Sequence, residues 1–140
     1  MTQEEKELLV KDLSARQIYG VKALISSLWN KDKESEECIT DSIYCVMRDG
    51  YVNTDTIDSD IPIENVKPYL RHLSSMTEEE YKQYRKFSYY GAAGYRNNDY
   101  KEMVATPSFE KMDFLNAHHF DYRGLIEKGL ALEAPEGMYK

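Results

Sequence analysis

An Asp-Gly pair between two β-rich runs constrains the fold of this chain more than any other stretch. Asp49-Gly50 separates residues 43–48 from residues 51–56, and this dipeptide favours a two-residue type I′ hairpin, because both central residues of that turn need positive φ. Such a turn also sets the register of the hairpin. Three pairs are predicted to face each other: Arg48 with Tyr51, Met47 with Val52, and Cys45 with Thr54.

Alternation along this hairpin predicts one face that belongs to a core. The core face is expected to carry Ile43, Cys45, Met47 and Val52, and the opposite face Tyr44, Arg48, Tyr51 and Asn53. Cys38 and Cys45 lie seven residues apart, which would place them on opposite faces of one strand, and we expect both to be reduced thiols.

A helix is predicted before the sheet. Thr2 and Glu5 have the spacing of a capping box, so the helix begins at about Gln3. Leu9 and Leu13 then share one face, and Gly20 marks the end of the helix and the approach to a strand that begins at Val21.

The fold predicted from these elements is α+β. Pro62 and Pro68 restrict any later strand to a sheet edge or a short piece. We expect a small bent antiparallel sheet or SH3-like barrel over about residues 18–70, with an N-terminal helix and a C-terminal set of short helices. The expected division is residues 1–76, the N-terminal helix plus a small β domain, and residues 77–140, a helical region.

Three short helices are predicted in the second part. Thr77 and Glu80 repeat the capping-box spacing, and Tyr81, Tyr84 and Phe87 are expected to form the buried stripe of that helix. A Tyr/Gly-rich loop follows at 89–106. Thr106-Pro107 is the predicted start of a helix that runs to Ala117. Asp121 as N-cap and Gly129 as left-handed C′ residue delimit the last helix, of about two turns.

Charge and hydropathy restrict the classes of partner. The net charge of −7 argues against binding of duplex DNA, since Lys and Arg supply most of that affinity. No apolar run approaches the roughly 20 residues that span a bilayer, and the N-terminus lacks the features of a signal peptide. We therefore expect a cytoplasmic protein without a membrane partner, and a homo-oligomer is compatible with this composition.

The sequence contains few candidate catalytic residues, and the two adjacent histidines are the main ones. His118 and His119 are adjacent, so on a helix they point about 100° apart and cannot jointly bind one metal as an i, i+4 pair could. They are read either as structural imidazoles at a helix end or as an acid–base or metal site. Because the chain lacks the G-x-S-x-G, P-loop, CxxC-pair and HExxH motifs, no catalytic residue, metal ligand or cofactor is assigned.

One segment departs from the acidic character of the chain. Residues 81–101 contain five Lys and Arg residues against a single acidic residue, Asp99, and are interleaved with Tyr. Cations beside aromatic rings and a glycine-containing loop suit an anionic planar ligand such as a nucleotide. The candidate ligand-binding residues are Arg85, Lys86, Tyr90, Tyr95 and Arg96. Alternatively, the first aromatic residues belong to the core, the cations to a solvated helix face, and the remaining tyrosines to a protein interface.

Three stretches carry a resemblance to known sequences. HHFDYRGLIEKGLALEAPEGMY, ENVKPYLRHLSSMTEEE and EEKELLVKDLSAR resemble a group of small uncharacterised proteins of gut Bacteroidales and their phages and prophages. The resemblance covers about half of the chain, and residues 20–60 and 85–112 depart from it. It implies a phage or mobile-element setting and brings no known activity or site residue.

Three functions from different classes follow as hypotheses. The first is a noncatalytic binding protein of phage or mobile-element origin that engages a host protein through a tyrosine-rich surface. The second is a noncatalytic nucleotide-binding protein, a counter-defence sponge that uses the basic aromatic segment 81–101. The third is a small enzyme that uses His118 or His119.

Overall fold

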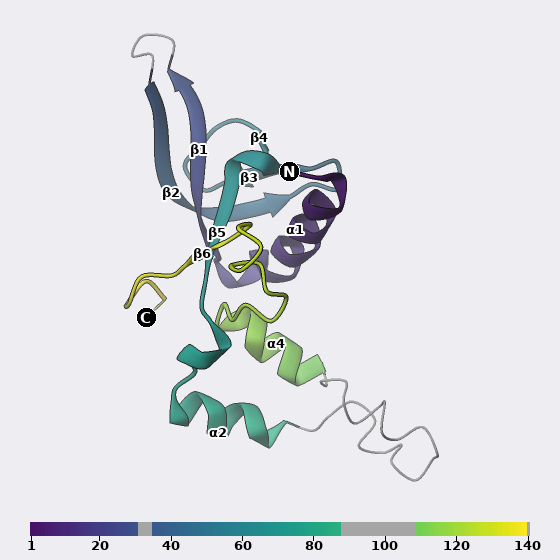
Figure 1. Ribbon diagram of the computed structural model, residues 1–140, viewed down its shortest axis with the longest axis vertical. Coiled ribbons are helices and arrows are strands. Elements are labelled where there is room, and N and C mark those ends of the chain that lie inside the picture. The colour runs from purple at the N-terminus through teal and green to yellow at the C-terminus, as the bar shows by residue number, and fades with distance from the viewer. Residues whose placement is uncertain (31–34, 88–108, 140) are drawn as a thin grey trace, which may run out of the picture.

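The computed structural model of the protein describes residues 1–30, 35–87 and 109–139. For residues 27–30 and 35–37 it describes the backbone alone. Figure 1 shows α1 beside the sheet, and α2 and α4 together at the lower end of the molecule. The helices are α1 (Gln3–Arg16), α2 (Glu78–Lys86) and α4 (Phe109–Ala117). The strands are β1 (Lys22–Asn30), β2 (Ser35–Val46), β3 (Tyr51–Thr54), β4 (Ile61–Pro62), β5 (Val66–Leu70) and β6 (Leu132–Glu133).

These strands form one sheet in the order β4-β3-β2-β1-β5-β6. Every pairing among β1 to β5 is antiparallel, whereas β6 joins β5 in parallel. The sheet is not closed, so the α+β prediction is confirmed in its open form and not as a barrel. Part of β1 and β2 extends above the other strands as a two-stranded ribbon (Figure 1).

The hairpin between β2 and β3 differs from the predicted type I′ turn. Met47 and Tyr51 close a three-residue loop, with Met47 N–H donating to Tyr51 O at 2.8 Å and Gly50 N–H donating to Met47 O at 3.1 Å. Gly50 has φ 93°, while Asp49 has no positive φ, as in a type I turn followed by a left-handed glycine. The two-residue turn predicted for Asp49-Gly50 is therefore wrong.

The longer loop shifts the predicted register. The observed pairs are Ile43 with Thr54, Cys45 with Asn53 and Val46 with Val52, with an irregularity between Ile43 and Cys45. The predicted pairs Cys45–Thr54, Met47–Val52 and Arg48–Tyr51 are wrong, because Arg48 belongs to the loop. Ile43 and Val52 are buried as expected, and Tyr44 is exposed. Cys38 and Cys45 are free thiols on β2.

Helix α1 covers the sheet with a buried face. The Thr2 hydroxyl accepts from Glu5 N–H and the Glu5 carboxylate accepts from Thr2 N–H, which confirms the capping box. Leu9 and Leu13 are fully buried. The core they join is built from α1, the strands and the C-terminal segment, residues 118–139 after α4: Leu9, Leu13, Val21, Ala23, Ile25, Ile43, Val52, Ile61, Ile63, Val66, Leu70, Leu125, Leu130 and Ala131.

A charged pair lies on the same buried face of α1. Arg16 and Asp12 are both fully buried, and Arg16 Nε donates to Asp12 Oδ2 at 2.8 Å. Arg16 also donates to Phe120 O at 2.6 Å, and Arg123 Nε donates to Asp12 Oδ1 at 3.1 Å. Buried charges need such partners, so this network fixes the C-terminal segment against α1.

Residues 121–130 form a single turn closed by a glycine and not the predicted two-turn helix. Leu130 N–H donates to Leu125 O and Gly129 N–H to Ile126 O, which is the bonding of a Schellman motif. Gly129 has φ 75°, so its role as the left-handed C′ residue is confirmed. Asp121 accepts from Leu125 N–H and Ile126 N–H at 2.9 Å, two residues beyond the expected N-cap distance. Only one turn forms.

In the described part of the chain, no helix combines the length and the apolar character needed to cross a membrane.

Candidate functional site

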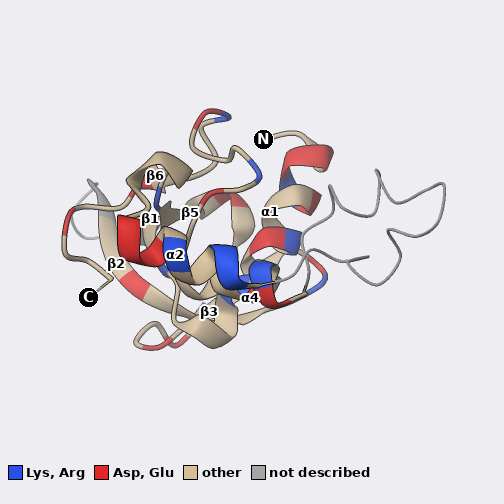
Figure 2. Ribbon diagram, turned by 90° about the horizontal axis from the view of Figure 1, so that it is seen from below, with Lys and Arg blue, Asp and Glu red and all other residues tan. Residues whose placement is uncertain are grey.

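Helix α2 presents the described part of the basic aromatic segment. Thr77 and Glu80 form the predicted capping box, since the Thr77 hydroxyl accepts from Glu80 N–H and Glu80 accepts from Thr77 N–H. Its first turn is acidic and its last turn is basic (Figure 2). This polarity suits the helix dipole, so α2 is stabilised locally and displays its cations at the C-terminal end.

Two of the five predicted ligand-binding residues lie on α2. Arg85 and Lys86 line a shallow hollow of about 430 Å³ together with Lys82, a residue that the sequence prediction did not select. Tyr90, Tyr95 and Arg96 fall outside the described residues, as does the predicted helix start at Thr106-Pro107. The structure therefore places three cations on one exposed helix face.

The aromatic residues of α2 divide between a core and the surface. The rings of Tyr84 and Phe87 pack on Phe114 of α4, with centroids 5.9 and 6.0 Å away. Tyr81 is 51% exposed, with Arg85 Cζ 5.5 Å from the centroid of its ring. The predicted buried stripe is therefore wrong for Tyr81. A three-residue step falls about 60° short of a full helical turn, so Tyr81 and Phe87 point about 120° apart.

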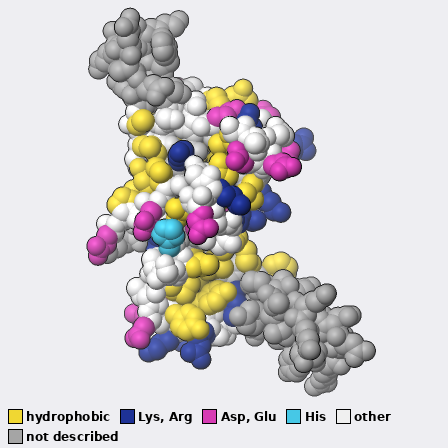
Figure 3. Space-filling model, viewed as in Figure 1, with side chains coloured by type: hydrophobic (Ala, Val, Ile, Leu, Met, Phe, Trp, Pro, Cys, Tyr) yellow, Lys and Arg dark blue, Asp and Glu magenta, His cyan; other side chains and the backbone are white. Residues whose placement is uncertain are grey.

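Helix α4 completes this surface. Phe109, its first residue, is 77% exposed, and Lys111 Nζ lies 4.5 Å from the ring centroid of Tyr84. Figure 3 shows hydrophobic side chains gathered at the lower end of the molecule, where α2 and α4 lie, with Lys and Arg at their border. We call the exposed aromatic and basic residues of these two helices the α2–α4 surface: Tyr81, Lys82, Arg85, Lys86 and Phe109.

An ion pair anchors α2 to the sheet. Arg71, which follows β5, donates two hydrogen bonds of 2.8 Å to Glu80, and its Cζ lies 4.3 Å from the ring centroid of Phe120. The Arg71 hydrogen bonds lower the pKa of Glu80 to about 2. His118 Nδ1 lies 3.3 Å from Glu80 Oε2. Because Glu80 contacts both neighbours, the orientation of α2 is fixed at its first turn.

The two adjacent histidines enter different environments. His118 packs against Phe114 with ring centroids 4.2 Å apart and the two ring planes tilted by 36°, and its Nδ1 faces Glu80. His119 is buried and stacks on Tyr139 at 3.7 Å. Burial lowers the pKa of His119 to about 4, so its imidazole is neutral at pH 7. Within the ranges described, no group of three His, Cys, Asp or Glu side chains is placed to hold a metal ion.

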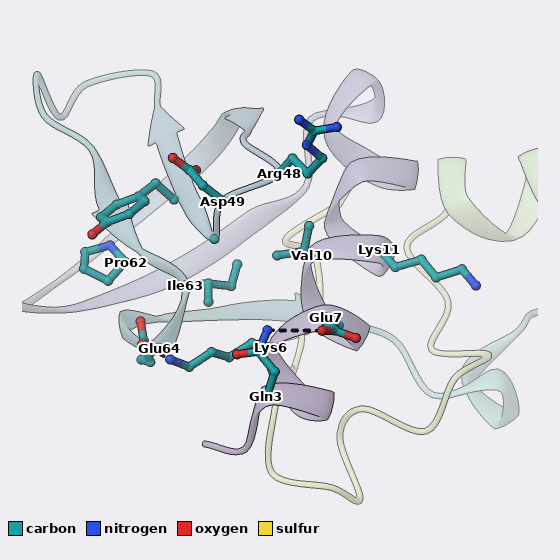
Figure 4. A pocket seen from close by; sticks show the side chains of 12 residues that line it. Gln3, Lys6, Glu7, Val10, Lys11, Arg48, Asp49, Pro62, Ile63 and Glu64 are labelled. Carbon is teal, nitrogen blue, oxygen red and sulfur yellow. Dashed lines mark hydrogen bonds and ion pairs between the residues drawn. The ribbon is translucent and has the colours of Figure 1, made fainter.

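A second hollow lies between α1 and the hairpin turn. This groove has a volume of about 560 Å³ and a partly apolar floor that includes Val10 and Ile63. Lys6 is already paired with Glu64 at 2.5 Å, and Figure 4 shows Arg48 and Lys11 pointing away from each other. Because its cations are paired or divergent, this groove is a weaker candidate than the α2–α4 surface.

Sequence reasoning missed Lys111 and the Arg71–Glu80 pair. Lys111 is buried although lysine is usually exposed, and its contact with Tyr84 joins α4 to α2 through two residues 27 positions apart in the chain. From the sequence, the spacing of Glu80 from Thr77 predicted only that Glu80 belongs to a capping box. The second role of Glu80, as acceptor for Arg71, depends on tertiary structure.

Comparisons of the chain with protein-family models, with curated proteins and with solved structures find no match.

Proposed function

We propose that this chain is a noncatalytic binding protein that engages a partner protein through the α2–α4 surface. The observation that carries this proposal is the half-exposed ring of Tyr81 with the Arg85 guanidinium over it. The neighbouring helix α4 begins with a further exposed aromatic residue, Phe109. Tyr, Phe and Arg are more frequent in protein interfaces than on the rest of the protein surface. A phage or mobile-element origin, with a host protein as the partner, belongs to the same proposal and comes from the sequence resemblance.

Contacts between α2 and the rest of the protein hold the α2–α4 surface in one arrangement, which favours binding. Arg71 and Glu80 fix the first turn of α2, and the Tyr84–Phe114 contact fixes its middle against α4. A surface held in one arrangement loses little conformational freedom when a partner binds, and this lowers the cost of association. The exposed aromatic side chains would then act as anchors that enter pockets of the partner.

The test compares two tyrosine variants in capture from a host lysate. Tyr81→Ala removes the proposed anchor, while Tyr44→Ala removes a tyrosine that is exposed on β2, away from this surface. We expect a captured protein to be retained by the wild type and by Tyr44→Ala and to be lost with Tyr81→Ala. Thermal unfolding establishes that both variants are folded. Equal retention by the two variants would contradict the assignment of this surface.

A nucleotide ligand is the second candidate, and one observation favours it. The hollow over α2 is lined by Lys82, Arg85 and Lys86, and three cations suit a phosphorylated ligand. Isothermal titration with mono-, di- and cyclic nucleotides at low and high salt tests this function. We expect binding that weakens with salt, because exposed charges are screened within about 10 Å at 0.1 M, and that disappears in Arg85→Glu. Flat titrations would remove the nucleotide function.

A further inference from the structure

A polar cavity lies between the start of β1, the end of α4 and the C-terminal segment, away from the α2–α4 surface. Its volume is about 310 Å³, at the lower end of the range for small-molecule sites. Its polar lining consists of Tyr19, Lys22, Arg71, His118, His119 and Tyr139. No Asp or Glu from the described parts of the chain lines it, although Glu80 lies behind the wall, paired with Arg71 and 3.3 Å from His118 Nδ1.

His119 lies in this wall with an unusual backbone. Its φ is 61°, and it is the one residue other than glycine with positive φ among those described. A left-handed conformation is disfavoured for a residue with a side chain, and such residues cluster at ligand-binding sites. The backbone is held there because Arg71 N–H donates to His119 O at 2.8 Å and His119 N–H donates to Asn116 O at 3.1 Å.

The imidazole of His119 has hydrogen-bonding capacity that the protein does not use. The residue is only 4% exposed, and its Nδ1 is buried without a hydrogen-bond partner in the described structure. The ring is neutral, so one nitrogen carries a proton and the other accepts. An unpaired buried donor is costly, and the proton is therefore assigned to Nε2, the ring nitrogen that is not among the buried atoms without a partner.

Lys22 brings a positive charge that remains uncompensated. Arg71 is neutralised by Glu80, whereas no carboxylate in the described regions is within ion-pair distance of the half-buried Lys22. Its backbone is fixed, because Lys22 N–H donates to the Tyr139 hydroxyl at 3.0 Å and that hydroxyl donates to Tyr69 O at 2.7 Å. A lysine on a fixed strand beside an open cavity can receive an anion.

The electrostatics of His119 support the same conclusion. Its pKa is lowered to about 4, first by burial and then by the charges of Arg16, His118, Arg71 and Lys22. Among these groups, Lys22 is the cation without a carboxylate partner in the described regions, so its charge acts on the cavity beside His119. A positive potential in a hollow of low dielectric attracts small anions more strongly than the same charges would in water.

We propose that this cavity binds the phosphate group of a small phosphomonoester. The Lys22 ammonium would supply the charge and His119 Nε2–H a directional hydrogen bond, while Arg71, held by Glu80, would line the site as a further hydrogen-bond donor. A phosphomonoester fits better than a monocarboxylate, because its charge approaches −2 at neutral pH and the unpaired Lys22 attracts it more strongly than a single negative charge. The cavity has room for a phosphate together with a small organic group, and the positive φ of Gly20 shapes the turn at its rim.

The test is an NMR titration of the His119 side-chain nitrogens with glycerol 3-phosphate, inorganic phosphate and acetate at equal ionic strength. We expect a saturable shift of the His119 Nε2 signal with both phosphates in the millimolar range, and at least tenfold weaker binding of acetate. No saturable shift with either phosphate would overturn the proposal. Acetate binding as tight as phosphate binding would overturn the assignment to phosphomonoesters.

Matched lysine variants locate the binding. Lys22→Met should weaken phosphate binding at least tenfold, whereas Lys67→Met, an exposed lysine on the neighbouring strand β5, should leave it unchanged. His119→Asn keeps a residue that tolerates positive φ and should weaken binding as well. If His119→Asn fails to fold, the lysine pair still decides. Equal affinity of Lys22→Met and the wild type would contradict the site, with no bearing on the α2–α4 surface.

Discussion

The guanidinium of Arg71 donates two hydrogen bonds of 2.8 Å to the carboxylate of Glu80, and this pair joins the end of β5 to the first turn of α2. Hydrogen bonds to charged groups stabilise a fold by about 1.5–3 kcal/mol. We therefore expect Glu80→Gln to lower the free energy of unfolding by that amount at pH 7. Urea unfolding followed by circular dichroism measures the loss. Glu79→Gln, an exposed residue on the same turn, is the control and should change little.

The same pair gives a pH dependence. The pKa of Glu80 falls from 4.5 to about 2 in the folded protein, so its contribution to stability is complete above pH 4.5 and is lost as the pH falls toward 2. The stability difference between wild type and Glu80→Gln should therefore shrink between pH 4.5 and pH 2. A difference that stays constant over this interval would show that the carboxylate charge is not what holds α2.

His119 should make the protein less stable in mild acid. Its pKa is lowered from 6.5 to about 4 by burial and nearby cations, so between pH 6.5 and pH 4 the unfolded chain takes up a proton that the folded chain does not. The shift corresponds to about 3 kcal/mol of stability lost across this interval. Urea unfolding at several pH values measures it. His119→Asn should remove this part of the pH dependence, and an unchanged slope in the variant would contradict the assignment.

Gly50 should resist substitution because of its backbone. A Cβ at this position would meet its nearest neighbour, Ile63, only at 3.9 Å, so space is not limiting, but φ is 93°. Gly50→Val should therefore lower stability by about 1 kcal/mol or more. Gly50→Asn, with a side chain that accepts positive φ more readily, should lose less. Equal melting temperatures of wild type and Gly50→Val would contradict the turn.

Asp121 should act as a structural acceptor. Its carboxylate accepts from Leu125 N–H and Ile126 N–H, and Asp121→Ala leaves both donors without that partner. We expect a loss of about 0.5–2 kcal/mol, as for other caps, measured by urea unfolding. Asp113→Ala on the exposed face of α4 should stay within about 0.5 kcal/mol of the wild type. A stable Asp121→Ala variant would leave this carboxylate without a structural role.

Local motifs could be predicted from the sequence, because few residues decide them. Thr2 with Glu5 and Thr77 with Glu80 place both partners of a capping box within four positions, and both boxes formed. Gly129 likewise took the left-handed C′ conformation. The α+β class followed from the same local evidence, since a helix, a hairpin and proline-limited strands succeed one another along the chain.

The hairpin register could not be decided from the pattern. A glycine that follows Asp fits a two-residue turn and also the left-handed position of a three-residue loop. Val46 and Met47 are both apolar, so either one makes a plausible partner for Val52 on the core face. Only the hydrogen bonds between Met47 and Tyr51 select the longer loop.

The cavity beside His119 could not be predicted from the sequence either. Lys22, His119 and Tyr139 are separated by up to 117 positions, and no spacing rule connects them. The adjacent histidines indicated a helix end, but the left-handed backbone of His119 depends on its bonds to Arg71 and Asn116. The α2–α4 surface was predicted in part, through Arg85 and Lys86, while Tyr81 was expected to be buried.

The buried pair of Asp12 and Arg16 has a consequence for the order in which the molecule is made. Arg16 bonds to Phe120, 104 positions later, and Asp12 to Arg123, 111 positions later. A ribosome therefore releases α1 long before the partners of its buried charges exist. Contacts so distant in sequence form late and slow folding, so the charges of Asp12 and Arg16 can acquire their full set of partners only after Arg123 has been synthesised.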